Sequence, residues 1–350
     1  MKALPSPSLI DGAKATLTSS LNTLCWHGDR MTLLYADTVF LHHETGNHPE
    51  NAERIRQLPE YLSKMGLWQR CQIPTWGPVN RGVLGLVHYP RYIDEIWALA
   101  KSGGGDADPD TVVSPSSYDV ALMATGAVCD AVTRILQGAE RRALCLVRPP
   151  GHHALPDRAM GFCIFNNVAV AAKLAVELFG VERVLIVDWD IHHGNGTQAI
   201  FWEDARVGFY SIHRWPFYPG TGREEEIGKG AGVGTTCNVP VSFGISRQQY
   251  WDRFANTLEK FAGKIRPQII FVSAGFDTHR LDPVGNLGLE SEDFGPMTEL
   301  VLDLAERYAE GRLISVLEGG YHPQALAESV GVHLAAMLDR NHTSTRSPSG

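Results

Sequence analysis

The residues best suited to chemistry in this sequence follow the apolar run VLIV at positions 184–187. Asp188, Asp190 and His192 come next at a spacing of two residues, so an extended backbone would place their side chains on one face. Two carboxylates and an imidazole that converge at the end of a strand are characteristic metal ligands. The alternative is a strand end whose polar side chains are only capped by the loop and solvated. Together with the turn Gly194-Asn195-Gly196 that follows, the pattern favours a metal site.

A second group of reactive side chains follows a predicted strand at 143–147. His152 and His153 are adjacent, and the preceding Pro149-Pro150-Gly151 makes their loop rigid. Such a pair could supply the acid and the base that a hydrolysis needs. A tandem histidine taken alone is more often just a polar loop, so its meaning depends on the metal ligands.

Two later strands end in residues that would complete such a centre. Asp277 ends the run RPQIIFVSAGFD, and with Asp190 and His192 it would give three protein ligands and an open position, as in catalytic zinc sites. A set rich in carboxylates also admits Fe²⁺. Asp188 could then hydrogen-bond a histidine instead of the metal. Tyr321, after two glycines in LEGGY, could donate to a developing oxyanion, although a loop tyrosine alone usually only packs.

Apolar strands alternate with helical patterns along most of the chain, which predicts a three-layer α/β/α fold around a mostly parallel sheet. We expect strands at 31–37, 143–147, 184–188, 206–214, 266–277 and 312–321. We expect helices from the turn at 48–50 toward residue 65 and at 79–100, 116–138, 166–179, 247–264 and, last, 296–310, with a loop at 102–110. The reactive residues follow strands, and open α/β sheets bind ligands at the carboxyl ends of their strands.

The composition is that of a soluble globular enzyme, with 350 residues of which 44% are hydrophobic and 20% are charged. No apolar run approaches the roughly 18 residues of a membrane span, so we expect no membrane partner. The formal net charge of -8 argues against nucleic acid binding, which usually needs a basic surface. Since no linker divides the strands, we expect one catalytic domain at 31–340, a loosely structured extension at 1–30 and a flexible tail at 341–350.

The cysteines and the first residues bear on the cellular compartment. The 6 cysteines are scattered without a CxxC pair, which is typical of reduced thiols rather than of disulfides or a zinc–thiolate site. Residues 1–30 lack the continuous apolar core of a signal peptide, so a cytoplasmic location is expected. The glycine-rich segments 222–230 and 230–234 have the wrong spacing for phosphate loops.

Four motifs together resemble one known family. RPPGHHA…MGFCIFNN, VDWDIHHGNGTQ, SAGFDTHRLDP and LEGGY are similar to the motifs of the zinc-dependent histone deacetylase superfamily, which includes the acetylpolyamine amidohydrolases. The resemblance spans residues 31–335, and the joint occurrence of the four motifs in this order is specific. The loop RPPGHH, without a Trp before the tandem histidine, and Asn195 both resemble the class II branch.

The resemblance implies an arginase/deacetylase fold with two metal sites. The catalytic zinc ion would be held by Asp190, His192 and Asp277. A buried structural potassium ion would be held by backbone oxygens of three residues of the first motif together with two residues of the following strand: Asp188, Asp190, His192, Ser211 and Ile212.

The resemblance also implies catalytic roles. His153 would be the general base and acid, His152 paired with Asp188 would assist electrostatically, and Tyr321 would hydrogen-bond the scissile carbonyl. Asn195 stands where class I enzymes have an Asp, so His153 lacks a charged partner. Tyr321 is present where some class II members have a histidine and deacetylate poorly, so we expect real activity.

A narrow substrate channel is implied as well, lined by Gly161, Phe162, Tyr218 and Val284. Val284 follows Asp282-Pro283, at the position where the polyamine-specific branch of class II carries a Glu. Without that carboxylate, the argument for selectivity toward a cationic polyamine is weaker. The family's substrate-gripping carboxylate precedes the helix that contains Tyr118, and three residues are candidates for it: Asp106, Asp108 and Asp110.

The sequence therefore predicts a zinc-dependent amidohydrolase that removes acetyl or short acyl groups from N-acetyl-lysine side chains of peptides or proteins, or from similar small acylamines. Within enzymes the alternative is an acetylpolyamine amidohydrolase. An alternative of another class is a non-catalytic protein that binds acyl-lysine or a metal. A missing Tyr321 or a broken ligand set would favour that last alternative, and both are intact.

Overall fold

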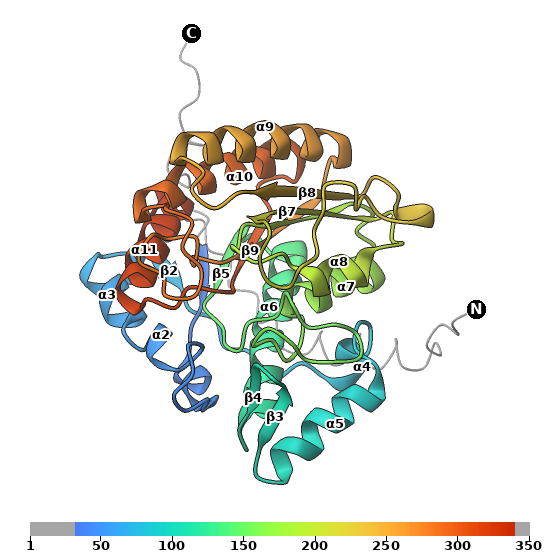
Figure 1. Ribbon diagram of the computed structural model, residues 1–350, viewed down its shortest axis with the longest axis vertical. Helices are drawn as coiled ribbons and strands as arrows, with labels where there is room; N and C mark the ends of the chain where they lie inside the picture. Colours follow the sequence, from blue (N-terminus) through green and yellow to red (C-terminus); the bar gives the residue numbers. More distant parts are fainter. Residues whose placement is uncertain (1–31, 340–350) are drawn as a thin grey trace.

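A parallel sheet of eight strands forms the centre of the molecule, for which we have a computed structural model that describes residues 32–339 (Figure 1). Its order is β2-β1-β5-β10-β9-β6-β7-β8, and each neighbouring pair is parallel. The strands are β1 (Thr32–Tyr35), β2 (Cys71–Gln72), β5 (Arg142–Cys145), β6 (Val184–Asp188), β7 (Val207–Arg214), β8 (Thr236–Val241), β9 (Ile269–Ala274) and β10 (Leu313–Leu317). The predicted extension at 1–30 and tail at 341–350 lie outside the described residues.

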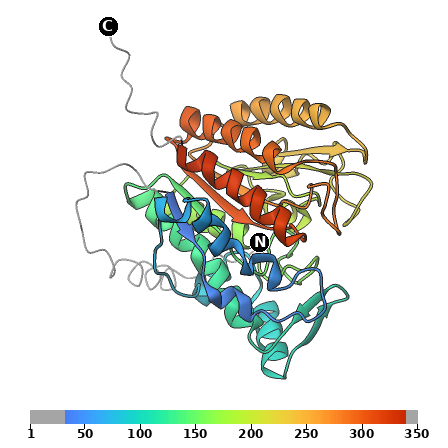
Figure 2. The same cartoon turned by 90° about the vertical axis from the view of Figure 1, so that its left-hand side faces the viewer.

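Helices cover both faces of the sheet, which explains why the central strands are buried along their whole length and mostly apolar. One face carries α9 (Arg247–Ile265), α10 (Phe294–Tyr308) and α11 (Pro323–Asp339), which are packed side by side (Figure 2). The other face carries α6 (Ser117–Gln137), α7 (Asn167–Phe179) and α8 (Asn195–Phe201). The predicted three-layer α/β/α architecture is confirmed.

The remaining helices are short and lie beside the two main layers: α2 (Glu53–Arg56), α3 (Leu58–Lys64), α4 (Arg81–Leu84), α5 (Pro90–Lys101), and the 3-10 turns η1 (Thr38–His42), η2 (Trp68–Arg70), η3 (Gly230–Gly232) and η4 (Ser291–Asp293). The single helix predicted at 79–100 is wrong, because the chain breaks between α4 and α5. Tyr89 is extended, as expected for a residue before a proline, and Pro90 begins the new helix. The helix predicted toward residue 65 is likewise divided, before Pro59.

Three other elements of the structure differ from the sequence prediction. The segment 102–110, predicted as a loop, contains β3 (Gly105–Asp108), which pairs antiparallel with β4 (Thr111–Val113). Strand β8 was not predicted, because its sequence contains Pro240; an edge strand tolerates a proline that a central strand would not. Helix α11 was also not predicted, and α10 is therefore not the last helix. Among residues 32–339 no helix is long and apolar enough to cross a membrane.

The sheet order brings the predicted reactive segments together. The loops that follow β5, β10, β9 and β6 carry the tandem histidine, Tyr321, Asp277 and the first motif, and these four strands are consecutive neighbours in the sheet. Because all of them are parallel, their carboxyl ends lie along one edge. The next strand, β7, leads into the aromatic segment 215–219, so a fifth loop reaches the same region.

Candidate active site and metal centre

The three predicted metal ligands meet beyond β6 and β9. Ligand atoms of Asp190, His192 and Asp277 all lie within 4.8 Å of one another, and the three residues are buried. His192 Nδ1 is 3.0 Å from Asp190 Oδ1 and 3.1 Å from Asp277 Oδ2. Two carboxylates and one imidazole nitrogen thus point to a common centre, which is a donor set that suits zinc or Fe²⁺.

Two further observations fit a cation at this centre. Asp277 Oδ2 is buried and accepts no hydrogen bond within the described part of the chain. A methyl group at Gly275 would lie 2.1 Å from Asp190 Oδ2, and one at Gly319 would lie 2.3 Å from Asp277 Oδ2. The two glycines therefore leave room for the two carboxylates. Asp190 Oδ2 accepts from Gly319 N at 2.8 Å, whereas Asp277 Oδ2 has no such donor within residues 32–339. A buried oxygen without a donor is costly unless a cation or solvent compensates it.

The electrostatics of the cluster lead to the same conclusion. Burial and the nearby Asp190 carboxylate raise the pKa of Asp277 to about 7. Burial alone would lower the pKa of His192, but Asp190 and Asp277 outweigh it and raise the pKa to about 9. Two buried carboxylates so close together need positive charge between them. A proton on His192 or a divalent cation held by the same three side chains would supply that charge.

His152 lies behind this cluster and is paired with Asp188. Its Nδ1 donates to Asp188 Oδ2 at 3.0 Å, and both residues are buried. Burial favours the neutral ring, but the carboxylates of Asp188 and Asp190 outweigh it and raise the pKa of His152 to about 10. Burial raises the pKa of Asp188 to about 6. The pair therefore favours a positive ring beside the predicted metal ligands.

His153 has a different partner and a different charge. Its Nδ1 lies 2.7 Å from Asn195 Oδ1, while Asn195 Nδ2 donates to Met160 Sδ at 3.3 Å. An amide oxygen only accepts, so the ring hydrogen is on Nδ1 and Nε2 carries a free lone pair. Burial, followed by the positive charges of His152 and His192, holds the pKa of His153 well below its usual range. A neutral imidazole with a free nitrogen can accept a proton.

Tyr321 approaches from the loop after β10. The Arg54 guanidinium lies 4.7 Å from the centre of its ring, and the Phe162 ring packs edge-on at 5.7 Å. Burial raises the pKa of Tyr321, so the hydroxyl keeps its proton. That hydroxyl makes no hydrogen bond to any residue in 32–339, so it can donate to a ligand.

Comparison with known proteins decides the family. The sequence matches the histone deacetylase domain over residues 48–337, which is most of the chain. The chain belongs to the histone deacetylase family. It is 39% identical over 302 residues to a histone deacetylase-like amidohydrolase of Pseudomonas aeruginosa, across 86% of this chain and 79% of that protein.

Two more relatives bear on fold and substrate. This deacetylase is 39% identical over 310 residues to human polyamine deacetylase HDAC10, across 83% of this chain but only 44% of that protein. The HD domain of HDA15 has a crystal structure that matches with a TM-score of 0.83 and 34% identity, covering 88% of this chain and 89% of that one. The protein thus has the arginase/deacetylase fold and is an amide-hydrolysing enzyme of the deacetylase type.

The aromatic residues predicted to line the channel of this deacetylase flank the metal cluster. Tyr218 packs edge-on against His153 at 5.2 Å. Gly161 lies directly against the same histidine, because an added methyl group would be 2.3 Å from its Cδ2. Phe162 has a positive φ of 69°, an unusual conformation for a large residue. Its turn is held from outside by Asp110, whose Oδ1 accepts from Gly161 N at 2.9 Å.

The β3–β4 hairpin distinguishes between the three candidate aspartates. Asp106 and Asp108 lie on β3, whereas Asp110 lies in the turn between the strands and contacts the Gly161–Phe162 segment. Burial raises the pKa of Tyr218, and the nearby Asp110 carboxylate raises it further. Of the three, Asp110 therefore lies nearest the aromatic residues of the predicted channel.

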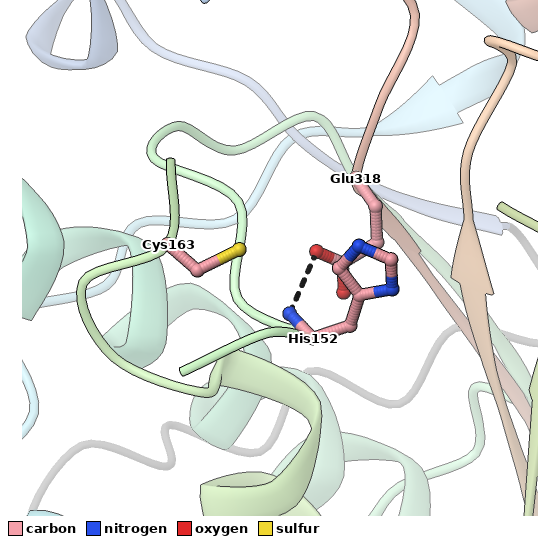
Figure 3. Close-up of side chains that lie close together, drawn as sticks. All are labelled: His152, Cys163 and Glu318. Carbon is pink, nitrogen blue, oxygen red and sulfur yellow. Dashed lines mark hydrogen bonds between the residues drawn. The ribbon is translucent and has the colours of Figure 1, made fainter. Parts of the chain in front are cut away.

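A second group of possible metal ligands in this deacetylase includes the first histidine of the tandem pair. His152, Cys163 and Glu318 are buried within 4.8 Å of one another, and Figure 3 shows their side chains close together. Glu318 is already occupied, because it accepts from the backbone of Gly151 at 2.7 Å and of His152 at 3.2 Å, and from Ser273 Oγ at 3.0 Å. Cys163 Sγ donates to Gly161 O at 3.3 Å, and burial raises the pKa of its thiol. The hydrogen bonds of Glu318 and Cys163 therefore hold the histidine loop in place.

The predicted potassium ligands are neighbours across two strands. Asp188 is opposite Ser211 in the β6–β7 register, and all five predicted ligands are buried. Ser211 Oγ lies 2.9 Å from His213 Nδ1. Three of the predicted ligands thus lie close together in sequence at the end of β6, and the other two lie on β7, which pairs with it.

Sequence reasoning missed several residues that support the site of this deacetylase. Arg54 Nε donates to Gly320 O at 2.6 Å, and its NH1 contacts Glu50 at 2.9 Å. The spacing of Glu50 and Arg54 is a helical ion-pair signal, but nothing local indicates that the pair is buried. Phe217 stacks on His192 at 5.1 Å. His43 is buried as well, and its Nδ1 lies 2.6 Å from Ser117 Oγ.

Proposed function

We propose that this protein is a zinc-dependent deacylase that removes acetyl or short acyl groups from lysine side chains or similar acylamines. The observation that carries the proposal is that three groups lie close together at one edge of the sheet. The His153 ring is 5.8 Å from the His192 ring. Burial raises the pKa of Tyr321, and this residue is near enough to Asp190 and Asp277 for their charges to raise it further. The three groups are the Asp190–His192–Asp277 cluster, the free Nε2 of His153 and the unpaired hydroxyl of Tyr321. An amide hydrolysis needs an electrophile for the carbonyl, a base for water and a donor for the oxyanion.

In this proposal Asp190, His192 and Asp277 hold the metal ion. When bound, zinc polarises the scissile carbonyl and lowers the pKa of a water molecule. The carboxylate-rich ligand set supports zinc, and Fe²⁺ is the alternative. The unsatisfied Asp277 Oδ2 and the room left by Gly275 and Gly319 support a resident cation over a site held together by protons alone.

The two histidines have different roles, and His153 carries both proton transfers. His153 is the base, because its Nε2 carries a lone pair and its low pKa keeps the ring neutral at the start. The same nitrogen then returns the proton to the leaving amine, which makes His153 the acid of the second step. His152 stays protonated through Asp188 and supports the negative charge of the reacting centre.

Tyr321 donates its hydroxyl hydrogen to the substrate carbonyl oxygen. Its raised pKa keeps the proton on the tyrosine, and the packing of Arg54 and Phe162 against the ring fixes its direction. A donor that is already oriented stabilises developing charge without reorganisation during the reaction.

The aromatic pair Phe162 and Tyr218 favours a slender acyl-lysine-like chain between two rings. We infer that Asp110 is the carboxylate that grips the substrate backbone, and its hydrogen bond to Gly161 beside the channel residue Phe162 supports this choice. A polyamine substrate is the second candidate, because a relative at 39% identity is named polyamine deacetylase. Val284 disfavours that candidate, since it offers no charge to a distal ammonium group.

The experiment compares kcat/KM for an acetyl-lysine peptide with kcat/KM for N-acetylputrescine on zinc-loaded protein. The proposal predicts a ratio well above one. A ratio well below one would assign the polyamine function instead, and turnover of neither substrate would favour a binding protein that retains the site.

We also propose that potassium occupies a structural site at Asp188, Asp190, His192, Ser211 and Ile212. The burial of all five residues and the Asp188–Ser211 register support it. Specific binding to the folded state would raise the midpoint of thermal unfolding in KCl over NaCl at equal ionic strength. Equal midpoints would contradict the proposal.

A further inference from the structure

One carboxylate, outside the metal ligands and the tandem histidine, joins two loops of the site. Asp282 Oδ1 accepts from Val284 N and from Gly285 N, each at 2.9 Å. Asp282 Oδ2 accepts from Tyr321 N at 2.6 Å. The residue is only 6% exposed, so solvent cannot replace these bonds easily. The side chain of Asp282 therefore links the loop after β9 to the loop after β10 at Tyr321 itself, in addition to the backbone bond from Phe276 N to Gly319 O at 3.1 Å.

The link matters because no regular structure holds Tyr321. Strand β10 ends at Leu317 and helix α11 begins at Pro323, and the residues between them are in neither a helix nor a strand. Gly320, directly before the tyrosine, has φ of +120°, which favours glycine and gives the backbone freedom. Hydrogen bonds from other segments must therefore fix the position of this backbone.

Arg54 and Asp282 share this task from two sides. Arg54 binds the carbonyl oxygens of Glu318 and Gly320 and lies over the Tyr321 ring. Asp282 binds the N–H of Tyr321 itself. Bonds to an ionised acceptor are shorter and stronger than neutral ones, and the 2.6 Å distance is that of a strong bond. A small shift of the tyrosine backbone would move its hydroxyl relative to the metal cluster.

We propose that Asp282 is a positioning residue for catalysis, which sets the Tyr321 hydroxyl by tying the Tyr321 backbone to the 282–285 loop. The proposal rests on the role of Tyr321 in the proposed function. It assigns to Asp282 no contact with substrate or metal. It predicts that losing the tie impairs turnover more than substrate binding.

Asp282→Asn tests the tie with almost no change in shape. An asparagine has one acceptor oxygen and one donor nitrogen, so it can accept from the loop N–H groups or from Tyr321 N, but not from both sets. We expect kcat to fall at least about tenfold, KM to stay within about threefold and the metal content to be unchanged, because misplaced catalytic groups affect the chemical step. Asp37→Asn is the matched control, since exposed Asp37 also accepts from a backbone N–H, at Val39, outside the site.

A double-mutant cycle separates positioning from general damage. Asp282→Asn is combined with Tyr321→Phe, and kcat, KM and zinc per chain are measured for the four proteins. If Asp282 acts through the Tyr321 hydroxyl, its substitution lowers kcat by less than about threefold once that hydroxyl is gone. If Asp282→Asn does not yield folded protein, Asp282→Ser takes its place in the same cycle.

The possible outcomes distinguish this proposal from the proposed function. Multiplicative losses in the double variant would overturn the positioning role, as would an unchanged kcat in Asp282→Asn. In either case a large loss in Tyr321→Phe alone would leave the proposed function standing. An unchanged kcat in Tyr321→Phe would instead overturn the role of the tyrosine, and with it the positioning role of Asp282.

Discussion

Two adjacent histidines behave differently here because their partners differ. His152 faces a carboxylate, which raises its pKa, whereas His153 faces the amide of Asn195, which adds no charge. The sequence indicated both partners through the resemblance. The direction of each ring and the choice of free nitrogen needed the distances, because spacing along the chain does not fix a hydrogen bond.

The substitution Tyr321→Phe tests the role of the tyrosine hydroxyl as the donor to the oxyanion. The substitution removes one hydroxyl and leaves the ring packing against Arg54 and Phe162. We expect kcat to fall about 10²- to 10³-fold, the loss typical of one oxyanion donor. Zinc content should stay at the wild-type value, because Tyr321 is not a ligand. Steady-state kinetics and metal analysis check this, and undiminished turnover would refute the assigned donor.

The substitution Asn195→Asp tests the assignment of His153 as the base. A carboxylate beside His153 Nδ1 would stabilise the protonated ring and raise its pKa above that in the wild type. The base must be neutral, so activity on the acidic side is lost as pH falls through that pKa. We therefore expect the acidic limb of the kcat/KM profile to move to higher pH in the variant. A profile that does not move, or moves to lower pH, would contradict the assignment of His153 as base.

At the scale of elements, glycines at strand ends shape the metal centre. Gly275 follows β9 directly, and a methyl group there would lie 2.1 Å from Asp190 Oδ2 and 2.6 Å from Asp190 Cα. The second contact is with backbone, so it cannot be relieved by a side-chain rotation. The carboxylate and its strand end must shift, and metal geometry is sensitive to such shifts.

We therefore predict that Gly275→Ala lowers the affinity for zinc by about tenfold or more, a loss comparable to that from disrupted support around metal ligands. The control is Gly77→Ala, because an added methyl group at Gly77 meets nothing within 4 Å. Zinc titration of stripped protein against a competing chelator measures both. Equal affinity in the two variants would show that the crowding at Gly275 is harmless.

The elements themselves were predictable where the physical signal is local. Fully buried strands such as β6 and β9 are mostly apolar, because helices cover both faces. Strand β8 escaped prediction because its position at the sheet edge, which tolerates Pro240, is a property of the whole sheet. Likewise, the hairpin turn that brings Asp110 to Gly161 is decided by tertiary contact and not by composition.

At the scale of the whole molecule, the order of the strands assembles the site. Segments separated by more than a hundred residues meet because β5, β10, β9 and β6 are neighbours. The alternation of strands and helices predicts a parallel sheet but not this order. Asp282 illustrates the limit: it lies within a recognised motif, yet its bond to Tyr321 depends on β9 and β10 being adjacent.

The stability of the whole molecule should depend on pH through the buried His88. His88 is buried, its Nδ1 donates to Leu155 O at 3.0 Å and its Nε2 accepts from Asn166 N at 2.9 Å. Burial lowers its pKa to about 3. The unfolded chain would bind a proton near pH 6.5 and the folded one would not, so the stability contributed by His88 is present above pH 6.5 and lost as pH falls toward 3.

The variant His88→Gln has no proton to gain at this position. From pH 6.5 downward, wild type should therefore lose about 1.4 kcal/mol more unfolding free energy per pH unit than the variant does. Urea unfolding at pH 7.5 and pH 5.5 measures the difference, and the comparison cancels the other titrating groups. Parallel losses in both proteins would mean that His88 takes up its proton in the folded state.

The most direct test of the account is acetate release from an acetyl-lysine peptide by stripped and zinc-reloaded protein. Chelator removes the metal, circular dichroism checks that the fold persists, and zinc is then added in steps. We predict little turnover in the stripped protein and recovery that saturates at one zinc ion per chain at the Asp190–His192–Asp277 cluster. Undiminished turnover by folded, stripped protein would contradict a metal-dependent mechanism.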